Sequence, residues 1–234
     1  GLKTTKTTTS SSLAHATGRA TPSPRYPLMP PQFVLASASP RRRELLASLG
    51  IRFSVVKPEI DETQRPGETA RDYVRRLSVE KAHAVAKRVD ASSLVLAADT
   101  VVILAGDGEV DGEILGKPEN PHEARVMLQR LRERPHAVCT ALTLLQMEAA
   151  SPARELTRLT ETRVVMRDYS DAEIEAYIAS GDPFDKAGGY AIQHEGFHPV
   201  AHIEGSYTNV VGLPLETLKA MLAEIRFPGF EAGS

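Results

Sequence analysis

The stretch FVLASASPRRRELL, residues 33–46, contains the transition that decides the fold. Its first four residues are apolar and predict a short buried strand. Ser39 then supplies a side chain that can cap a helix, and Pro40 is a favoured first residue of a helix. The stretch therefore predicts a strand that leads through a short turn into a helix, which is the unit from which α/β domains are built.

The rest of the chain first repeats this alternation and then places strands next to one another. Apolar runs predict strands, and amphipathic runs that begin at Ser, Thr or Asn predict helices. The order of these elements predicts an α/β fold with a mixed, twisted sheet and flanking helices. Predicted strands cover 33–36, 51–56, 94–104, 137–147, 155–167, 189–193 and 199–203, predicted helices cover 40–49, 69–88, 120–134, 170–181 and 214–225, and a hairpin is expected within 101–115.

The 234 residues suffice for one large domain or two small ones, and their 41% hydrophobic content is typical of a globular protein. We expect a flexible N-terminal extension over 1–31, which is rich in Thr, Ser and Pro and carries a charge of +4. A single domain is expected over 32–234, with two lobes around a central cleft as a further possibility. A transit peptide explains such an extension, but a cloning remnant or a misplaced start is favoured, because Met29 directly precedes the first strand.

Charge and cysteine content exclude several classes of protein. The net charge of −2 gives no general signal for a nucleic-acid partner or a membrane surface. The single cysteine, Cys139, cannot form an internal disulfide or a cysteine-based zinc cluster, and we expect it in the core. The sequence contains no run of 18 apolar residues, so it predicts no transmembrane helix. A cytoplasmic location is therefore expected.

The turn between residues 37 and 42 is the first candidate for a binding site. The start of a helix presents free backbone N–H groups and a partial positive charge, which suit a phosphate. Ser37 adds a hydroxyl, and Arg41 and Arg42 add guanidinium groups that match phosphate geometry. An ordinary capped helix followed by a solvated basic turn explains the same residues equally well.

Asp99 and Thr100 interrupt the otherwise apolar run 94–104. A carboxylate on a buried strand is costly unless it is paired or binds a metal, so Asp99 indicates either a cleft with a cation such as Mg²⁺ or a structural pair with an arginine. Lys81 follows Leu77 by four residues and shares the inward face of the predicted helix. It either extends along the helix surface to solvent or reaches an anionic substrate in a cleft.

Three further residues give weaker signals. Lys117 and Lys186 lie beside glycines, where the backbone can approach a ligand closely, and Gln193 offers an amide able to read a polar base edge. The histidines show no ligand spacing for a metal. Taken together, the cations and the few acids predict a site for a metal and a polyphosphate.

These residues belong to blocks that occur in the same order as in a known family. The chain resembles the Maf family of nucleoside triphosphate pyrophosphatases from residue 33 to about 225. The blocks are LASASPRRRELL at 35–46, PEIDE at 58–62, EKA at 80–82, ADTVV at 98–102, GKP at 116–118, DKAGGYAIQ at 185–193 and EGSYTNVVGLPL at 204–215.

The resemblance implies hydrolysis of dTTP or UTP between the α- and β-phosphates, which removes unwanted nucleotides from the pool. It also implies an inosine-triphosphatase-like fold, a divalent cation (Mg²⁺ or Mn²⁺), a nucleoside triphosphate as partner and a homodimer. By position, Asp99 is the general base and, with Glu59, a metal ligand. Arg41, Thr100 and Gln193 bear on substrate choice, and the phosphate ligands are Ser37, Arg42, Lys81, Lys117 and Lys186.

Three alternatives stay open at this point. The chain can act on other or modified nucleotides, such as 7-methyl-GTP, or serve as a nucleotide-binding regulator of septum formation. Nucleic-acid binding through the basic extension is disfavoured, because the remaining chain carries a charge of −6.

Overall fold

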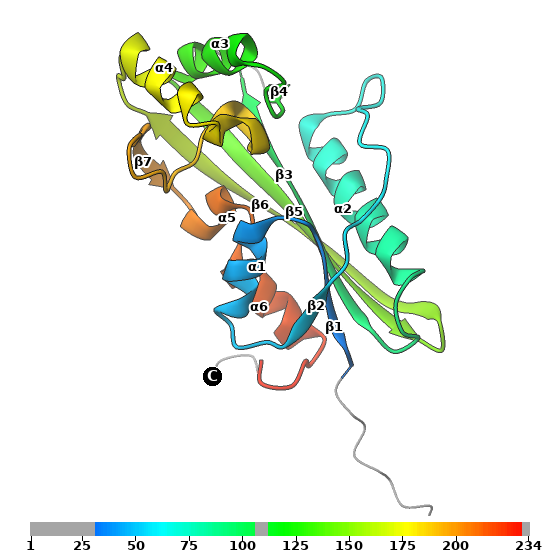
Figure 1. Ribbon diagram of the computed structural model, residues 1–234. Helices are drawn as coiled ribbons and strands as arrows, with labels where there is room; N and C mark the ends of the chain where they lie inside the picture. The colour runs from blue at the N-terminus through cyan, green and yellow to red at the C-terminus, as the bar shows by residue number, and fades with distance from the viewer. Residues whose placement is uncertain (1–30, 106–111, 231–234) are drawn as a thin grey trace, which may run out of the picture. The chain divides into compact units, whose positions relative to one another are not determined.

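The computed structural model describes residues 31–105 and 112–230, and the chain from Pro31 onward forms one compact unit (Figure 1). The extension expected over 1–31 lies outside the described residues except for Pro31, and so does most of the loop 106–112. In chain order the elements are β1 (Phe33–Ala36), α1 (Pro40–Ala47), β2 (Phe53–Val55), α2 (Ala70–Ala86), β3 (Leu94–Leu104), β4 (Glu113–Leu115), α3 (Pro121–Leu131), β5 (Pro135–Glu148), β6 (Ser151–Met166), α4 (Asp171–Ala179), the 3₁₀ turns η1 (Asp182–Asp185) and η2 (Ala187–Gly189), β7 (Val200–Glu204), α5 (Tyr207–Val211) and α6 (Leu215–Glu224).

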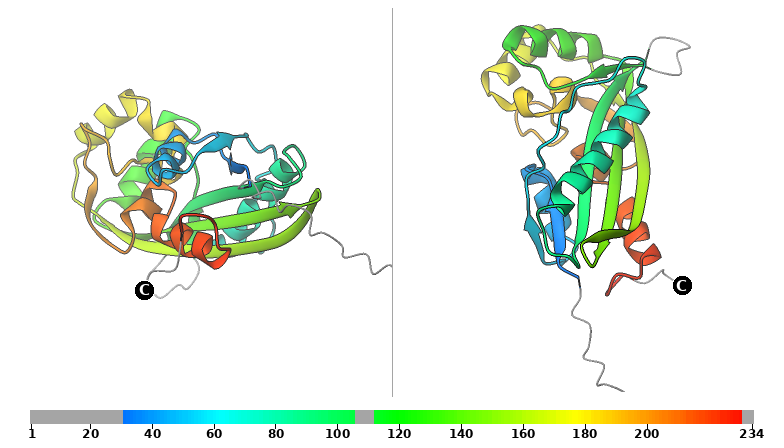
Figure 2. Two further views of the ribbon diagram at one scale, coloured as in Figure 1. Left: turned by 90° about the horizontal axis from the view of Figure 1, so that it is seen from below. Right: turned by 90° about the vertical axis from the view of Figure 1, so that its right-hand side faces the viewer.

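Seven strands form one sheet in the order β2-β1-β3-β5-β6-β7, with β4 paired to β3 away from this path. The pairs of β1 with β2 and β3 are parallel, and the other pairs are antiparallel. The mixed sheet with flanking helices predicted from the sequence is thus confirmed. Figure 2 shows the long strands β3, β5 and β6 extending from one end of the sheet to the other.

One edge of β3 is interrupted. On this edge β1 pairs with residues 94–97 and β4 pairs with residues 102–104, while β5 runs along the other edge over 94–103. Within the described part of the chain, residues 98–101 therefore have no strand partner on the first edge. The interruption opens the sheet beside Asp99 and Thr100.

The two faces of the sheet bury different helices. Leu94 and Leu96 pack with α1 and α6 on one face, whereas Val95 and Ala97 pack with α2 on the other. Farther along β3, Val102 and Leu104 join a cluster that includes α3 and α4. Because side chains alternate along a strand, Asp99 points to the α2 face and Thr100 to the opposite face, between the two clusters.

Most predicted helix starts are confirmed by their capping contacts. The hydroxyls of Ser39 and Thr69 accept hydrogen bonds from backbone N–H groups at the starts of α1 and α2, and Ser170 forms a capping box with Glu173 at α4. Cys139 is fully buried, as expected. No helix within 31–105 and 112–230 has the length and apolar character needed to cross a bilayer.

The segment 189–193 was expected to be a strand, and this is wrong. Gly188 and Gly189 have φ values of +72° and +69°, which turn the chain into η2 instead of extending it. The N–H of Ala191 then donates to the side-chain oxygen of Tyr177 rather than to a neighbouring strand. The short helix α5 was not predicted, because its five residues contain Thr and two Val and have little helical preference.

Candidate active site

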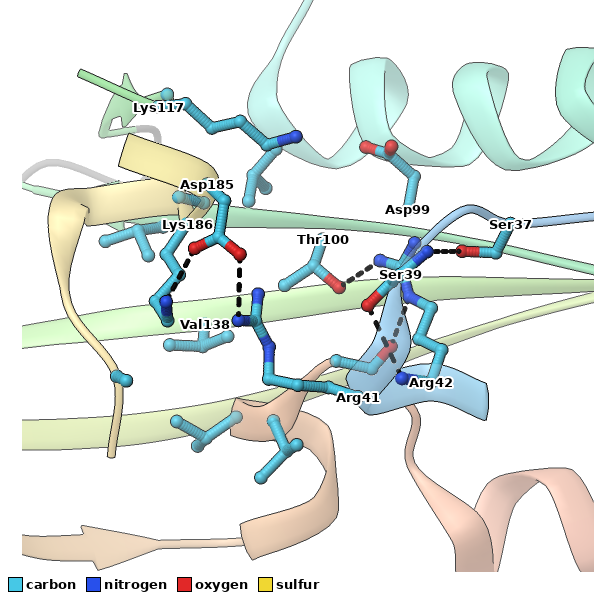
Figure 3. Close-up of a pocket in the computed structure, with 18 of the residues that line it drawn as sticks. Ser37, Ser39, Arg41, Arg42, Asp99, Thr100, Lys117, Val138, Asp185 and Lys186 are labelled. Atoms are coloured by element: carbon cyan, nitrogen blue, oxygen red, sulfur yellow. Dashed lines mark hydrogen bonds and ion pairs between the residues drawn. The ribbon is translucent and has the colours of Figure 1, made fainter. Parts of the chain in front are cut away.

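A cavity of about 1000 Å³ opens where β3 lacks a strand partner. Its walls come from the β1–α1 turn, the segment after β4, helix α2 and the segment from Asp182 to Glu195 (Figure 3). Its volume is in the range of known ligand pockets. The structure brings together nearly all of the predicted site residues there, namely Ser37, Arg41, Arg42, Lys81, Asp99, Thr100, Lys117, Lys186 and Gln193.

The β1–α1 turn is held by its own hydroxyl groups. The hydroxyl of Ser37 accepts a hydrogen bond from the N–H of Ser39 at 3.1 Å, and that of Ser39 accepts one from the N–H of Arg42 at 3.4 Å. These bonds replace partners that the first turn of a helix lacks. They start α1 at the pocket, so that Arg41 and Arg42 both line it.

Arg42 is fixed on two sides. Its Nε donates to the carbonyl of Gly212 at 2.8 Å, and its Nη2 donates to the hydroxyl of Thr100 at 2.9 Å, which also contacts the hydroxyl of Thr140 at 2.9 Å. Burial lowers the pKa of Arg42, but guanidinium groups keep their proton in proteins. The remaining nitrogen, Nη1, makes no hydrogen bond with the described residues and is available to a phosphate.

Asp99 is 7% exposed and its Oδ1 accepts a hydrogen bond from Lys81 Nζ at 2.6 Å. The same ammonium contacts Glu62 Oε1 at 3.0 Å. Burial raises the pKa of Asp99 above its ordinary value, although Lys81 acts in the opposite direction. The carboxylate thus has a lysine partner, not the arginine considered above, and its Oδ2 makes no hydrogen bond or ion pair with the described residues. Lys81 itself is buried in the pocket wall and does not extend to solvent.

The donor set of the pocket fits a hard divalent cation that is shared with a substrate. Asp99 and Glu62 contribute two carboxylates around one point, and Mg²⁺ is commonly held by one or two carboxylates together with substrate phosphates. Among the described residues, no cluster of three or more His, Cys, Asp or Glu side chains could hold a metal without substrate. Glu59, expected as the second metal ligand, is exposed and does not line the pocket, whereas Glu62 of the same block does line it.

The opposite wall carries a group of ion pairs. Lys186 Nζ donates to the carbonyl and Oδ1 of Asp182 at 2.7 and 2.8 Å and to Oδ1 of Asp185 at 2.5 Å. Asp185 Oδ2 lies 3.5 Å from Arg41 Nη1 (Figure 3). Lys117 and Gln193 are exposed and have no hydrogen bond or ion pair with the part of the chain that the structure describes. Both side chains are therefore free to contact a ligand.

The lining of the pocket carries both signs of charge. It holds six cationic and five acidic side chains. Three of the six cations, Arg41, Lys81 and Lys186, contact an acid, so a polyphosphate would meet three cations without an acidic partner among the described residues. The cationic lining residues are Arg41, Arg42, Lys57, Lys81, Lys117 and Lys186, and the acidic ones are Glu62, Asp99, Asp182, Asp185 and Glu195.

Sequence reasoning missed the residues that hold Glu62. The hydroxyl of Tyr73 donates to the Glu62 carbonyl at 2.8 Å, and Arg76 donates to the carbonyl of Thr63 at 3.1 Å while it pairs with the carboxylate of Glu68. The PEIDE block marked this loop, but nothing in it distinguished Glu62 from Glu59. The helical spacing of Tyr73 and Arg76, three residues apart, was the available signal that one face of α2 supports the loop.

Known proteins resemble this chain over most of its length. A family model described as "Maf-like protein" matches residues 32–225. A "dTTP/UTP pyrophosphatase" of Myxococcus xanthus is 50% identical over 83% of this chain and 93% of its own length, and one of Syntrophus aciditrophicus is 47% identical over 81% and 90%. A solved dITP/XTP pyrophosphatase from Mycobacterium abscessus aligns over 83% of this chain and 95% of its own with 14% identity and a TM-score of 0.41.

Proposed function

Because this chain belongs to the Maf family, we propose that it is a nucleoside triphosphate pyrophosphatase that hydrolyses dTTP and UTP to the monophosphate and pyrophosphate. The observation that carries the proposal is the buried Asp99 at the unpaired edge of β3, in a pocket with arginine and lysine side chains. The names of its relatives, which are 45–50% identical, support the choice of substrate. Such an enzyme would remove these nucleotides from the cellular pool.

Asp99 is the general base of the proposed reaction. Lys81 holds one carboxylate oxygen, and the other can accept a proton from a water molecule. The water oxygen then bonds to the α-phosphorus, the bond from the α-phosphorus to the bridging oxygen breaks, and pyrophosphate leaves. Burial raises the pKa of Asp99, which makes its carboxylate a stronger base than an exposed one.

Positive groups on two sides of Asp99 neutralise the phosphates. Arg42 offers its free Nη1 from a fixed position, and Lys117 reaches the pocket from the segment after β4. Arg41 becomes available when a phosphate replaces Asp185 as its partner. Ser37, at the start of α1, provides a hydroxyl on the same side. Fixed cations of this kind stabilise the charge that develops on the departing pyrophosphate.

Asp99 and Glu62 would hold the divalent cation, Mg²⁺ or Mn²⁺, together with substrate oxygens. A bound cation of this type polarises the phosphoryl group and neutralises charge on the leaving pyrophosphate. Lys81 lies between the two carboxylates and keeps them close together without a metal. Gln193 is the proposed reader of the base edge, and the homodimer and the cytoplasmic location remain predictions from the sequence.

The substitution Asp99→Asn tests the proposal. It keeps the size of the side chain and removes the base, so turnover of dTTP and UTP should fall by about 10²–10⁴. Lys81 keeps Glu62 as a charged partner at 3.0 Å, so the variant should still fold, which urea denaturation checks. Glu195→Gln, an exposed carboxylate of the same pocket, is the matched control. A folded Asp99→Asn enzyme with near wild-type turnover would contradict the role of Asp99.

A panel of substrates separates the alternatives. Pyrophosphate release is measured with dTTP, UTP, CTP, ATP, GTP and 7-methyl-GTP in the presence of Mg²⁺ or Mn²⁺. Preference for dTTP and UTP supports the proposal, whereas preference for 7-methyl-GTP indicates an enzyme for modified nucleotides. Tight nucleotide binding without release of pyrophosphate indicates a nucleotide-binding regulator.

A further inference from the structure

The ammonium of Lys186 has no hydrogen left for a ligand. An ammonium has three donors, and three protein oxygens, two of Asp182 and one of Asp185, lie within 2.5–2.8 Å of Nζ. The residue is only 7% exposed. A phosphate oxygen can bind Lys186 only if one of these three contacts is broken.

The local charge also disfavours a phosphate at this point. One lysine and two aspartates give this cluster a net negative charge, and Asp185 is directed to Arg41 as well. Burial alone would raise the pKa of Asp182, but the hydrogen bonds from Lys186 and Tyr177 outweigh burial and hold it below its ordinary value. Asp182 is therefore a charged acceptor that competes with a phosphate for Lys186.

From Asp182 a chain of contacts leads to the segment 191–194. The hydroxyl of Tyr177 donates to Asp182 Oδ2 at 2.6 Å and accepts a hydrogen bond from the N–H of Ala191 at 3.0 Å. The Tyr177 ring also packs edge-on against the ring of His194, with centroids 4.8 Å apart. Tyr177 is 2% exposed, and burial raises its pKa, so the hydroxyl keeps its proton.

We propose that Lys186 is a positioning residue that acts through Asp182 and Tyr177 on the segment 191–194, and that it does not bind the triphosphate. This inference rests on the proposed function, since the segment includes Gln193, the proposed reader of the base. Lys186 holds Asp182 in place, Asp182 orients the hydroxyl of Tyr177, and that hydroxyl fixes the backbone of Ala191. The segment then presents its side chains to the pocket in one conformation.

Calorimetric titration with tripolyphosphate, UTP and CTP separates the two roles. Tripolyphosphate has no base, so it reports on phosphate ligands alone. Tyr177→Phe, which changes no charge, should leave the tripolyphosphate affinity unchanged, and both Tyr177→Phe and Lys186→Met should reduce the preference for UTP over CTP by about twofold to tenfold, the effect of one hydrogen bond. Lys117→Met should do the opposite. The double variant of Lys186 and Tyr177 should lose no more preference than either single variant, because both act along one chain of contacts.

A parallel loss of tripolyphosphate affinity in Lys186→Met and Lys117→Met, with the UTP preference retained, would overturn the inference. Equal binding of UTP and CTP by the wild type would also overturn it, because the segment 191–194 would then not discriminate between bases. If Lys186→Met does not fold, Tyr177→Phe decides, because it keeps the ring that stacks on Phe197. The proposed function fails separately, through a wild type that binds these ligands but hydrolyses neither dTTP nor UTP.

Discussion

Replacement of Lys81 by methionine removes the only cation in contact with both Asp99 and Glu62 in the described part of the chain. The side chains of Lys81 and Asp99 are 9% and 10% exposed, and their charged atoms lie 2.6 Å apart. Loss of one partner from a buried pair costs about 3–5 kcal/mol, because the other charge stays buried without compensation. We therefore expect Lys81→Met to lower the free energy of unfolding by about this amount at pH 8.

The loss should depend on pH with a defined sign. Burial already raises the pKa of Asp99, and removal of Lys81 raises it further, so the folded state binds a proton more readily than the unfolded state. Relative to the wild type, the variant should therefore lose least stability at low pH, and the loss should grow as the pH rises through the pKa of Asp99 in the folded state. The difference between variant and wild type should be smaller at pH 5 than at pH 8.

Urea denaturation at both pH values measures this, with two controls. The double variant Lys81→Met/Asp99→Asn should recover most of the stability, because the uncompensated charge is gone. Arg163→Met breaks the pair with Glu204, whose side chains are 50% and 59% exposed, and should cost less than about 1 kcal/mol. A loss below about 1 kcal/mol in Lys81→Met, or an equal loss at pH 5 and pH 8, would refute the reasoning.

Two further predictions concern stability. Burial lowers the pKa of His136 to about 4, so on acidification the unfolded chain takes up a proton before the folded one does. Between pH 7 and pH 5 the wild type should therefore lose about 2 kcal/mol of unfolding free energy that His136→Gln does not lose. The exposed control His202→Gln should behave as the wild type, and equal pH profiles for all three proteins would contradict the prediction. Gly188→Ala places a methyl group 2.9 Å from Val102 Cγ2, whereas Gly67→Ala, at a similar φ, meets nothing within 4 Å. Gly188→Ala should therefore cost at least about 1 kcal/mol more in urea denaturation, and equal losses would show that Val102 moves aside.

Local signals in the sequence determined much of the fold. Capping contacts and apolar periodicity act over a few residues, so Ser39, Thr69 and Ser170 marked helix starts that the structure confirms. Both ends of β3, Leu94–Leu104, were predicted correctly for the same reason. The prediction of a strand over 189–193 failed because the positive φ values of Gly188 and Gly189 outweigh the apolar pattern of this segment.

The sequence by itself also determined which chemical groups the site contains, since Asp99 in an apolar strand and Lys81 on an apolar helix face are anomalies visible without coordinates. Only the tertiary structure decided what these groups do. The gap on the edge of β3 depends on where β1 ends and β4 begins, and the loop that brings Glu62 to the pocket is held by Tyr73 and Arg76 of α2. Likewise, Lys186 was expected to contact phosphate, but its donors face Asp182 and Asp185. The charge of a side chain follows from the residue type, whereas the availability of that side chain to a ligand depends on neighbours that are distant in the chain.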